Sequence, residues 1–174
     1  KKIANTLLKS KKIFIAISCI VLSVLVGFSY WAIAQTNPPT SPDFELLTFD
    51  GEQLLLSDLR GDIVVLIFGQ AGVRLVDRCP RILETWELYE SRGDVHFIGL
   101  AYRDQVAESR AFIEEFGITY TNAPDLGHEI ADVFALQGIP STFIINRKGE
   151  VVSYLYARID MDILITEIET LLSN

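Results

Sequence analysis

The chain has 174 residues, of which 49% are hydrophobic and 22% charged, with two cysteines and a formal net charge of −8. This length and composition fit one ordinary globular domain with an appended segment, and they exclude an intrinsically disordered chain. Two cysteines are too few for a disulfide framework or a four-thiolate metal site, and the acidic balance argues against nucleic acid as a partner.

Charge is distributed unevenly along the chain. The first twelve residues hold five lysines, and no acidic residue precedes Asp43. From residue 35 onward there are 10 basic and 23 acidic residues, a net charge of −13. A basic, apolar beginning is therefore followed by an acidic remainder, and the two parts belong in different environments.

Residues 13–34 form an uncharged, strongly apolar stretch. A helix of this length rises about 33 Å, enough to cross a hydrocarbon core of about 30 Å. The preceding lysines favour a cytoplasmic N-terminus, because basic segments are retained on that side. We therefore expect a cytoplasmic basic tail over 1–12 and a transmembrane anchor in the lipid bilayer over 13–34. The rest is expected on the periplasmic or extracellular side of the cytoplasmic membrane.

Two features follow the apolar stretch. The tripeptide Ala32-Ile33-Ala34 before Gln35 fits a signal-peptide cleavage site, which leaves a cleaved leader as the alternative to a retained anchor. Residues 35–42 hold three of the six prolines, which predicts an extended linker. The exported domain is then expected over 43–174.

The exported part alternates segments typical of strands and helices. A hairpin is expected around Asp50-Gly51, and the apolar runs 63–68 and 95–100 predict strands buried on both faces. Further strands are expected over 141–145 and 151–156, and helices over 78–92, 105–116, 127–136 and 160–172. Gly117 is expected to end the second helix, and the inward face of the last helix is assigned to Ile163, Ile168, Leu171 and Leu172. This order predicts an α/β sandwich with a mixed sheet covered by helices on both faces.

Several strings of the sequence resemble the thioredoxin superfamily, and within it the TlpA-like and ResA-like membrane-anchored thiol-disulfide proteins with a redoxin domain. The strings are FELLTFDGEQLLLSDLRGDIVVLIF, DVHFIGLAYRD and AFIEEFGITYTNAPDLGHEIADVFALQGIPSTFIINRKGEVV. The most specific piece is GIPSTFIINRKGEVV, in which Pro140 matches the cis-proline of the family. The resemblance implies a thioredoxin-like fold for nearly the whole exported part.

Redox-active members of this family carry a Cys-x-x-Cys pair between the first buried strand and the following helix. One thiolate attacks a substrate disulfide and the second thiol resolves the mixed disulfide. The corresponding loop, 69–77, reads GQAGVRLVD and contains no cysteine. Counting forward from the strand places the pair at Val73 and Val76, whereas counting backward from the following proline places it at Gly72 and Leu75. Neither register can perform two-thiol chemistry.

Cys79 is the only cysteine after the apolar stretch, since Cys19 lies within it. One interpretation is a small apolar residue packed in the core. The other is a reactive thiol, because the Cys79–Pro80 step resembles that of peroxiredoxins and copper-handling Sco proteins. A peroxiredoxin site would need a Thr or Ser where Val76 stands, and a Sco copper site would need a cysteine where Leu75 stands. We therefore expect no metal and no cofactor, and retain Cys79 as the sole catalytic candidate.

A docking role does not depend on thiols. In the thioredoxin fold the backbone beside the cis-proline pairs with an extended peptide, so Pro140 and Ile139 are candidate docking residues, together with Arg74 of the loop. A turn proline without further function is the alternative for Pro140. His96 and His128 have no partners at metal-ligand spacing and are interpreted as structural or surface residues.

Two functions remain open. The first is a redox-inactive thioredoxin-like domain, anchored by one helix, that acts as a structural, docking or assembly subunit of a larger membrane complex. Its partners would be other membrane protein subunits, by family association those of an electron-transfer complex. The second is a thiol-disulfide oxidoreductase or peroxidase-like enzyme of the TlpA/ResA type that works through Cys79. The sequence favours the first, because hydrocarbon side chains occupy the positions of the redox pair.

Overall fold

The computed structural model describes residues 39–71, 79–157 and 160–173, with only the backbone of Cys79. The chain divides into two units, 1–38 and Pro39–Asn174. The basic tail, the predicted anchor and the first half of the predicted linker lie outside the described residues. None of the helices in the described part is long and apolar enough to cross a membrane.

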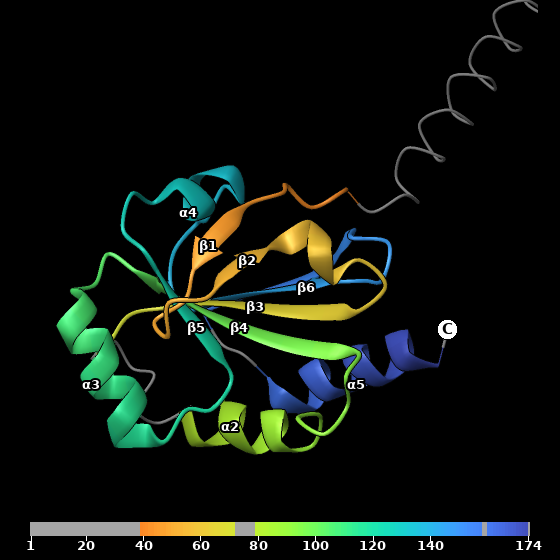
Figure 1. The fold of residues 1–174 in the computed structure, drawn as a ribbon. Coiled ribbons are helices and arrows are strands. Elements are labelled where there is room, and N and C mark those ends of the chain that lie inside the picture. The colour runs from red at the N-terminus through yellow and green to blue at the C-terminus, as the bar shows by residue number, and fades with distance from the viewer. Residues whose placement is uncertain (1–38, 72–78, 158–159, 174) are drawn as a thin grey trace, which may run out of the picture. The chain divides into compact units, whose positions relative to one another are not determined.

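Five strands form the central mixed sheet, in the order β5-β4-β3-β6-β7 (Figure 1). β3, β4 and β5 run parallel, while β6 is antiparallel to β3 and β7 is antiparallel to β6. The strands are β3 (Ile63–Gly69), β4 (Val95–Tyr102), β5 (Thr121–Asp125), β6 (Ser141–Ile145) and β7 (Val151–Tyr156).

Other elements cover both faces of this sheet. They are the hairpin strands β1 (Glu45–Leu47) and β2 (Gln53–Leu55), the 3₁₀ helix η1 (Leu56–Leu59), α2 (Cys79–Glu87), α3 (Val106–Phe116), α4 (Glu129–Val133) and α5 (Met161–Leu172). The hairpin and α4 lie on one side of the sheet, and α2 and α5 lie on the other (Figure 1). The expected α/β sandwich with a mixed sheet is confirmed.

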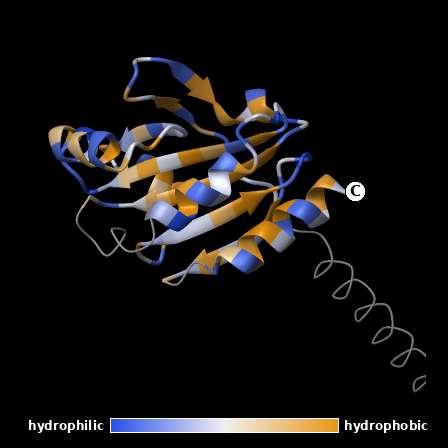
Figure 2. Ribbon diagram, turned by 90° about the horizontal axis from the view of Figure 1, so that it is seen from below, coloured by the Kyte–Doolittle hydropathy of each residue, from blue (hydrophilic) through white to orange (hydrophobic). Residues whose placement is uncertain are grey.

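Each face of the sheet buries its own hydrophobic cluster. The first cluster includes Leu66 and Phe68 of β3 with Phe134, and the second includes Ile67 of β3 with Leu164 of α5. Because β3 is buried along its whole length, its sequence is a continuous apolar run without a polar face. In Figure 2 the hydrophobic colour accordingly follows the central strands, whereas the helices alternate hydrophobic and hydrophilic residues.

The hairpin and the stop of α3 form as predicted. Gly51 has φ +87° and its amide donates to the carbonyl of Thr48, which closes the turn between β1 and β2. Gly117 caps α3 in the left-handed conformation, with φ +60°, so a residue without a Cβ is favoured at that position.

Four expectations were wrong or incomplete. β5 was not predicted, because its sequence TNAPD has no apolar run. The α-helical part of the helix expected over 78–92 ends at Glu87, and α4 is shorter than the expected 127–136. In α5 the side chain of Ile163 is 47% exposed, and the buried residues are Met161, Leu164 and Ile168. Ile168 is buried, and Leu171 and Leu172 pack against the second cluster, so the expected inward face is wrong only at Ile163.

The domain begins a few residues before the expected boundary at 43. The amide of Val151 donates to the carbonyl of Pro39, and the amide of Ser41 donates to the carbonyl of Gly149, both at 2.8 Å. Residues 39–41 are thus hydrogen-bonded to the start of β7, and the end of the predicted linker belongs to the folded unit.

Candidate functional site

The candidate site lies where β3 ends, at the position of the redox loop in the resembling family. β3 ends at Gly69, and α2 includes Cys79 and Pro80. The five loop residues singled out from the sequence lie outside the described part of the chain: Gly72, Val73, Arg74, Leu75 and Val76. The side chain of Cys79 lies outside it as well. The sequence contains no cysteine between Gly69 and Cys79, so this region offers one thiol.

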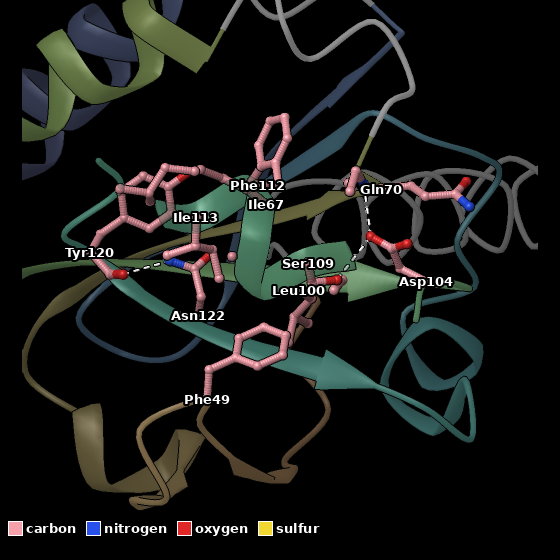
Figure 3. Close-up of a pocket in the computed structure, with 15 residues that line it drawn as sticks. Phe49, Ile67, Gln70, Leu100, Asp104, Ser109, Phe112, Ile113, Tyr120 and Asn122 are labelled. Carbon is pink, nitrogen blue, oxygen red and sulfur yellow. Dashed lines mark hydrogen bonds between the residues drawn. The ribbon is translucent and has the colours of Figure 1, made fainter. Parts of the chain in front are cut away.

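The start of the loop is tied to the segment after β4. The amide of Ala71 donates to Asp104 Oδ2 at 2.8 Å, and the hydroxyl of Ser109 donates to the same oxygen at 2.8 Å. The side-chain amide of Gln70 donates to the carbonyl of Arg103 at 3.1 Å. Figure 3 shows Asp104 between the end of β3 and the first turn of α3. One carboxylate therefore fixes the departure of the loop relative to α3.

The peptide bond between Ile139 and Pro140 is cis, as expected for the proline at this position. The Pro140 side chain is buried, while Ile139 is half-buried against the first core cluster. The carbonyl of Pro140 accepts a hydrogen bond from the amide of Ala157. Within the described ranges no group hydrogen-bonds the backbone of Ile139. The Ile139 backbone is thus the group of this segment that can pair with an added chain.

A small pocket lies beside the loop, between the sheet and α3 (Figure 3). Its volume is about 60 Å³, and its walls are mainly apolar, with Ile67, Leu100 and Phe112 among them. Its polar lining includes Asp104 and Asn122. The pocket offers space for a small apolar group, and its described walls contain no thiol.

A model of one protein family matches most of this domain. The model, described as the AhpC/TSA family, covers residues 40–154, from the start of the domain into β7. The chain belongs to the AhpC/TSA family. This assignment agrees with the redoxin resemblance that the sequence strings indicate.

Several relatives of this AhpC/TSA chain are named thiol-disulfide oxidoreductases. The thiol-disulfide oxidoreductase ResA of Geobacillus kaustophilus (strain HTA426) is 25% identical over 152 residues, which are 87% of each chain. The ResA of Bacillus thuringiensis (strain Al Hakam) is 24% identical over 154 residues, which are 84% of this chain and 88% of that protein. These matches confirm the resemblance to the ResA-like branch of the thioredoxin superfamily.

Solved structures confirm the thioredoxin-like fold. A thiol:disulfide interchange protein of the thioredoxin family from Chlorobium tepidum TLS aligns with a TM-score of 0.71 and 20% identity, over 79% of this chain and 98% of that one. A secreted Mycobacterium tuberculosis disulfide oxidoreductase homologous to E. coli DsbE aligns with a TM-score of 0.66 and 20% identity, over 74% and 96% of the two chains.

The two histidines have separate partners away from this loop. His96 Nε2 lies 2.9 Å from Asp62 Oδ2, and His128 Nδ1 lies 3.2 Å from the carbonyl of Asp125. Among the residues that the structure describes, no three His, Cys, Asp or Glu side chains are grouped so that they could hold a metal ion. Each histidine therefore has a hydrogen-bond partner of its own.

Asp104 was not singled out from the sequence. The available signal was its place directly after a buried strand and before a helix, where a carboxylate often accepts hydrogen bonds from backbone amides at the helix start. The contact with Ala71 brings together residues 33 positions apart. No local pattern encodes such a pairing, and only the strand order of the sheet brings the two residues together.

Proposed function

We propose that this protein is a thiol-disulfide exchange enzyme of the ResA type that works with a single thiol, Cys79. The observation that carries the proposal is the match, over 87% of both chains, to a protein named thiol-disulfide oxidoreductase. The position of Cys79 supports it, because α2 follows β3 directly after the loop in which the family places its redox pair. Amino ends of helices favour thiolates over thiols.

The exchange step needs only one thiol on the enzyme. The Cys79 thiolate attacks one sulfur of a substrate disulfide, so that a Cys79–substrate disulfide forms and the other substrate sulfur leaves as a thiolate and takes a proton. A second thiolate, from the substrate or from a small thiol, then attacks this mixed disulfide and releases Cys79. The substrate is reduced when two small thiols are oxidised, and isomerised when its own thiol resolves the intermediate.

The free backbone of Ile139 supports a protein substrate. An extended substrate segment can pair with the Ile139 N–H and C=O, as strands pair at a sheet edge. A disulfide-exchange activity fits placement of the domain outside the cytoplasm on the proposed anchor 13–34, because protein disulfides persist there. We propose this placement together with the activity.

The test is disulfide exchange by the full-length chain in detergent micelles, with Cys19→Ala to leave Cys79 as the only thiol. Native protein at neutral pH is mixed with 5,5′-dithiobis(2-nitrobenzoate), and one equivalent of nitrothiobenzoate should be released at a rate at least that of free cysteine. Cys79→Ser in the same background is the control. The protein should also accelerate insulin reduction by excess glutathione. Reaction only after denaturation would overturn the proposal.

One observation favours a second candidate, a redox-inactive docking or assembly subunit of a membrane complex. The loop 69–77 has no cysteine, and either register of the missing pair holds apolar or small residues: Val73 and Val76, or Gly72 and Leu75. In this case the thiol would stay unreactive, and purification in mild detergent at native abundance would recover the chain with stoichiometric membrane subunits. Recovery as a monomer would contradict this candidate.

A further inference from the structure

A groove of about 470 Å³ lies between β1 and α4, and we call it the β1–α4 groove. The two elements lie side by side on the same side of the sheet (Figure 1). None of its lining residues belongs to β3, to the described start of the loop or to α2, so a role for this groove does not depend on the activity proposed for Cys79.

The two walls of the groove present matching side chains. In β1 the side chains of Glu45 and Leu47 point away from the core, because Leu46 between them is 5% exposed and packs in the first cluster. In α4 the wall carries Glu129 and Val133, which are four residues apart and share one helix face. Each wall thus contributes one carboxylate and one aliphatic side chain.

The aliphatic side chains of the groove are exposed to an unusual degree. Leu47 is 58% exposed and Val133 is 51% exposed. A second groove of about 410 Å³ shares Leu47 and Glu129 and adds Val106 and Leu126. Within the described ranges, four of the nine large exposed hydrophobic side chains therefore line these two adjoining grooves. Exposed apolar side chains that gather in one place mark interaction sites, whereas isolated ones do not.

The charge of the β1–α4 groove has one sign. Asp43, Glu45 and Glu129 line it, and no lysine or arginine does. Arg110 lines the adjoining groove, where its guanidinium donates to the carbonyl of Phe49. The Asp43 carboxylate already accepts the amides of Phe44 and Ser57. Within the described part of the chain, Glu45 and Glu129 have no ion pair. Two carboxylates beside exposed aliphatic carbon complement a cationic and apolar ligand and repel nucleic acid and anionic lipid.

We propose that the β1–α4 groove is a docking site for a protein partner, through a segment that places a lysine or arginine next to an aliphatic or aromatic residue. The cation pairs with Glu45 and Glu129, and the apolar side chain covers Leu47 and Val133. A second copy of this chain is a poor occupant, because each copy carries a net charge of −13 after residue 34. A peptide cation suits these carboxylates better than a metal ion, since the described residues contain no group of three His, Cys, Asp or Glu side chains placed to hold one.

The test uses the full-length chain in lipid nanodiscs and a fluorescent heptapeptide of alternating lysine and leucine as the probe. Fluorescence anisotropy should show saturable binding that weakens with added salt. Peptides that alternate glutamate with leucine, or lysine with serine, should bind at least fivefold more weakly. Equal binding of the lysine–serine peptide would show non-specific charge attraction and overturn the proposal.

Variants locate the binding site. Glu45→Gln with Glu129→Gln should weaken probe binding about fivefold, since each exposed ion pair contributes up to about 1 kcal/mol. Leu47→Ser with Val133→Ser should weaken it further. The matched control is Glu87→Gln with Leu88→Ser, an exposed carboxylate and an exposed leucine of the α2 region. Circular dichroism checks that each variant is folded. If Leu47→Ser unfolds the domain, the Glu45→Gln, Glu129→Gln double variant alone tests the proposal. Unchanged probe affinity in the Glu45→Gln, Glu129→Gln variant would refute the docking site. So would an equal loss of affinity in the Glu87→Gln, Leu88→Ser control.

Discussion

The Asp104 carboxylate accepts a 2.8 Å hydrogen bond from the backbone amide of Ala71, and so joins the end of β3 to the segment before α3. The same carboxylate accepts the hydroxyl of Ser109 and the amide of Gln105. Asp104 thereby serves three donors that belong to two different parts of the chain. The residue fixes where the loop that leads to Cys79 begins.

We expect Asp104→Ala to lower the free energy of unfolding by about 1–3 kcal/mol, because it leaves the Ala71 amide and the Ser109 hydroxyl without their acceptor. Hydrogen exchange of the Ala71 amide should be markedly faster, and Asp104→Asn should restore part of its protection. Asp58→Ala, at an exposed carboxylate of η1, is the control. Unchanged exchange at Ala71 in Asp104→Ala would show that the contact does not hold the loop.

The buried hydroxyl of Thr142 has no hydrogen-bond partner within the described ranges. Thr142 is fully buried in β6, two residues after Pro140. Burying a hydroxyl costs desolvation free energy, and here no hydrogen bond compensates for it. Thr142→Val should therefore raise the free energy of unfolding by about 1 kcal/mol. Denaturant unfolding at neutral pH measures the change.

The neighbouring residue provides the control for Thr142. The Ser141 hydroxyl is also in β6 but donates to the carbonyl of Gly138 at 2.6 Å. Ser141→Ala should therefore lower stability by about 1 kcal/mol. A loss of stability in Thr142→Val would indicate that its hydroxyl has a partner outside the described residues.

Gly99 of β4 lies where a side chain would collide with Asn122. A Cβ at Gly99 would overlap the Asn122 amide and lie 3.1 Å from Tyr120 Cε2. Gly99→Ala should therefore cost about 1–3 kcal/mol of stability, as overpacking does elsewhere. In an Asn122→Ala background the same substitution should cost clearly less stability. Urea unfolding of the unmodified protein, the two single variants and the double variant gives this double-mutant cycle. Gly93→Ala is the control, because a Cβ there meets nothing within 4 Å.

How far the sequence predicts this molecule depends on whether the signal is local. The continuous apolar run of β3 and the turn at Gly51 depend on neighbouring residues, and both were predicted correctly. β5 was missed because it is an edge strand in which Pro124 is tolerated, so neither alternation nor β-branched enrichment marks it. The exposed Ile163 shows that periodicity finds a helix more reliably than its inward face, which tertiary packing decides.

In the candidate site, too, residues marked by a local sequence pattern were predicted and contacts between distant segments were not. Pro140 was identified through a family string that extends over neighbouring residues, and its peptide bond is cis. The contact of Asp104 with Ala71 and the placement of Glu45 and Glu129 along one groove were not predicted, because each brings together residues far apart in the sequence. The lone thiol of Cys79 and a single-thiol enzyme could be named from the sequence as an alternative, and the comparison with relatives is what makes it the proposed function.

Asp94 joins three segments at the end of the sheet where β4 begins. Its carboxylate accepts hydrogen bonds from Arg92 and, at 2.8 Å, from Arg147, which also donates to the carbonyl of Leu171 near the end of α5. The hydrogen bond from the Arg92 guanidinium, followed by the charges of Arg92 and Arg147, lowers the pKa of Asp94 below its ordinary value. Folding therefore favours the ionised carboxylate.

The sign of the pH dependence follows from this shift. Because the pKa of Asp94 is lower in the folded than in the unfolded chain, its contribution to stability is present above the ordinary aspartate pKa of about 4 and is lost as the pH falls through the folded value. Asp94→Asn should lower stability at pH 7 and make the decline below pH 4 shallower. Urea unfolding between pH 3 and pH 7 measures both effects, with Asp58→Asn as the control. Parallel pH profiles for Asp94→Asn and the unmodified protein would contradict the coupling.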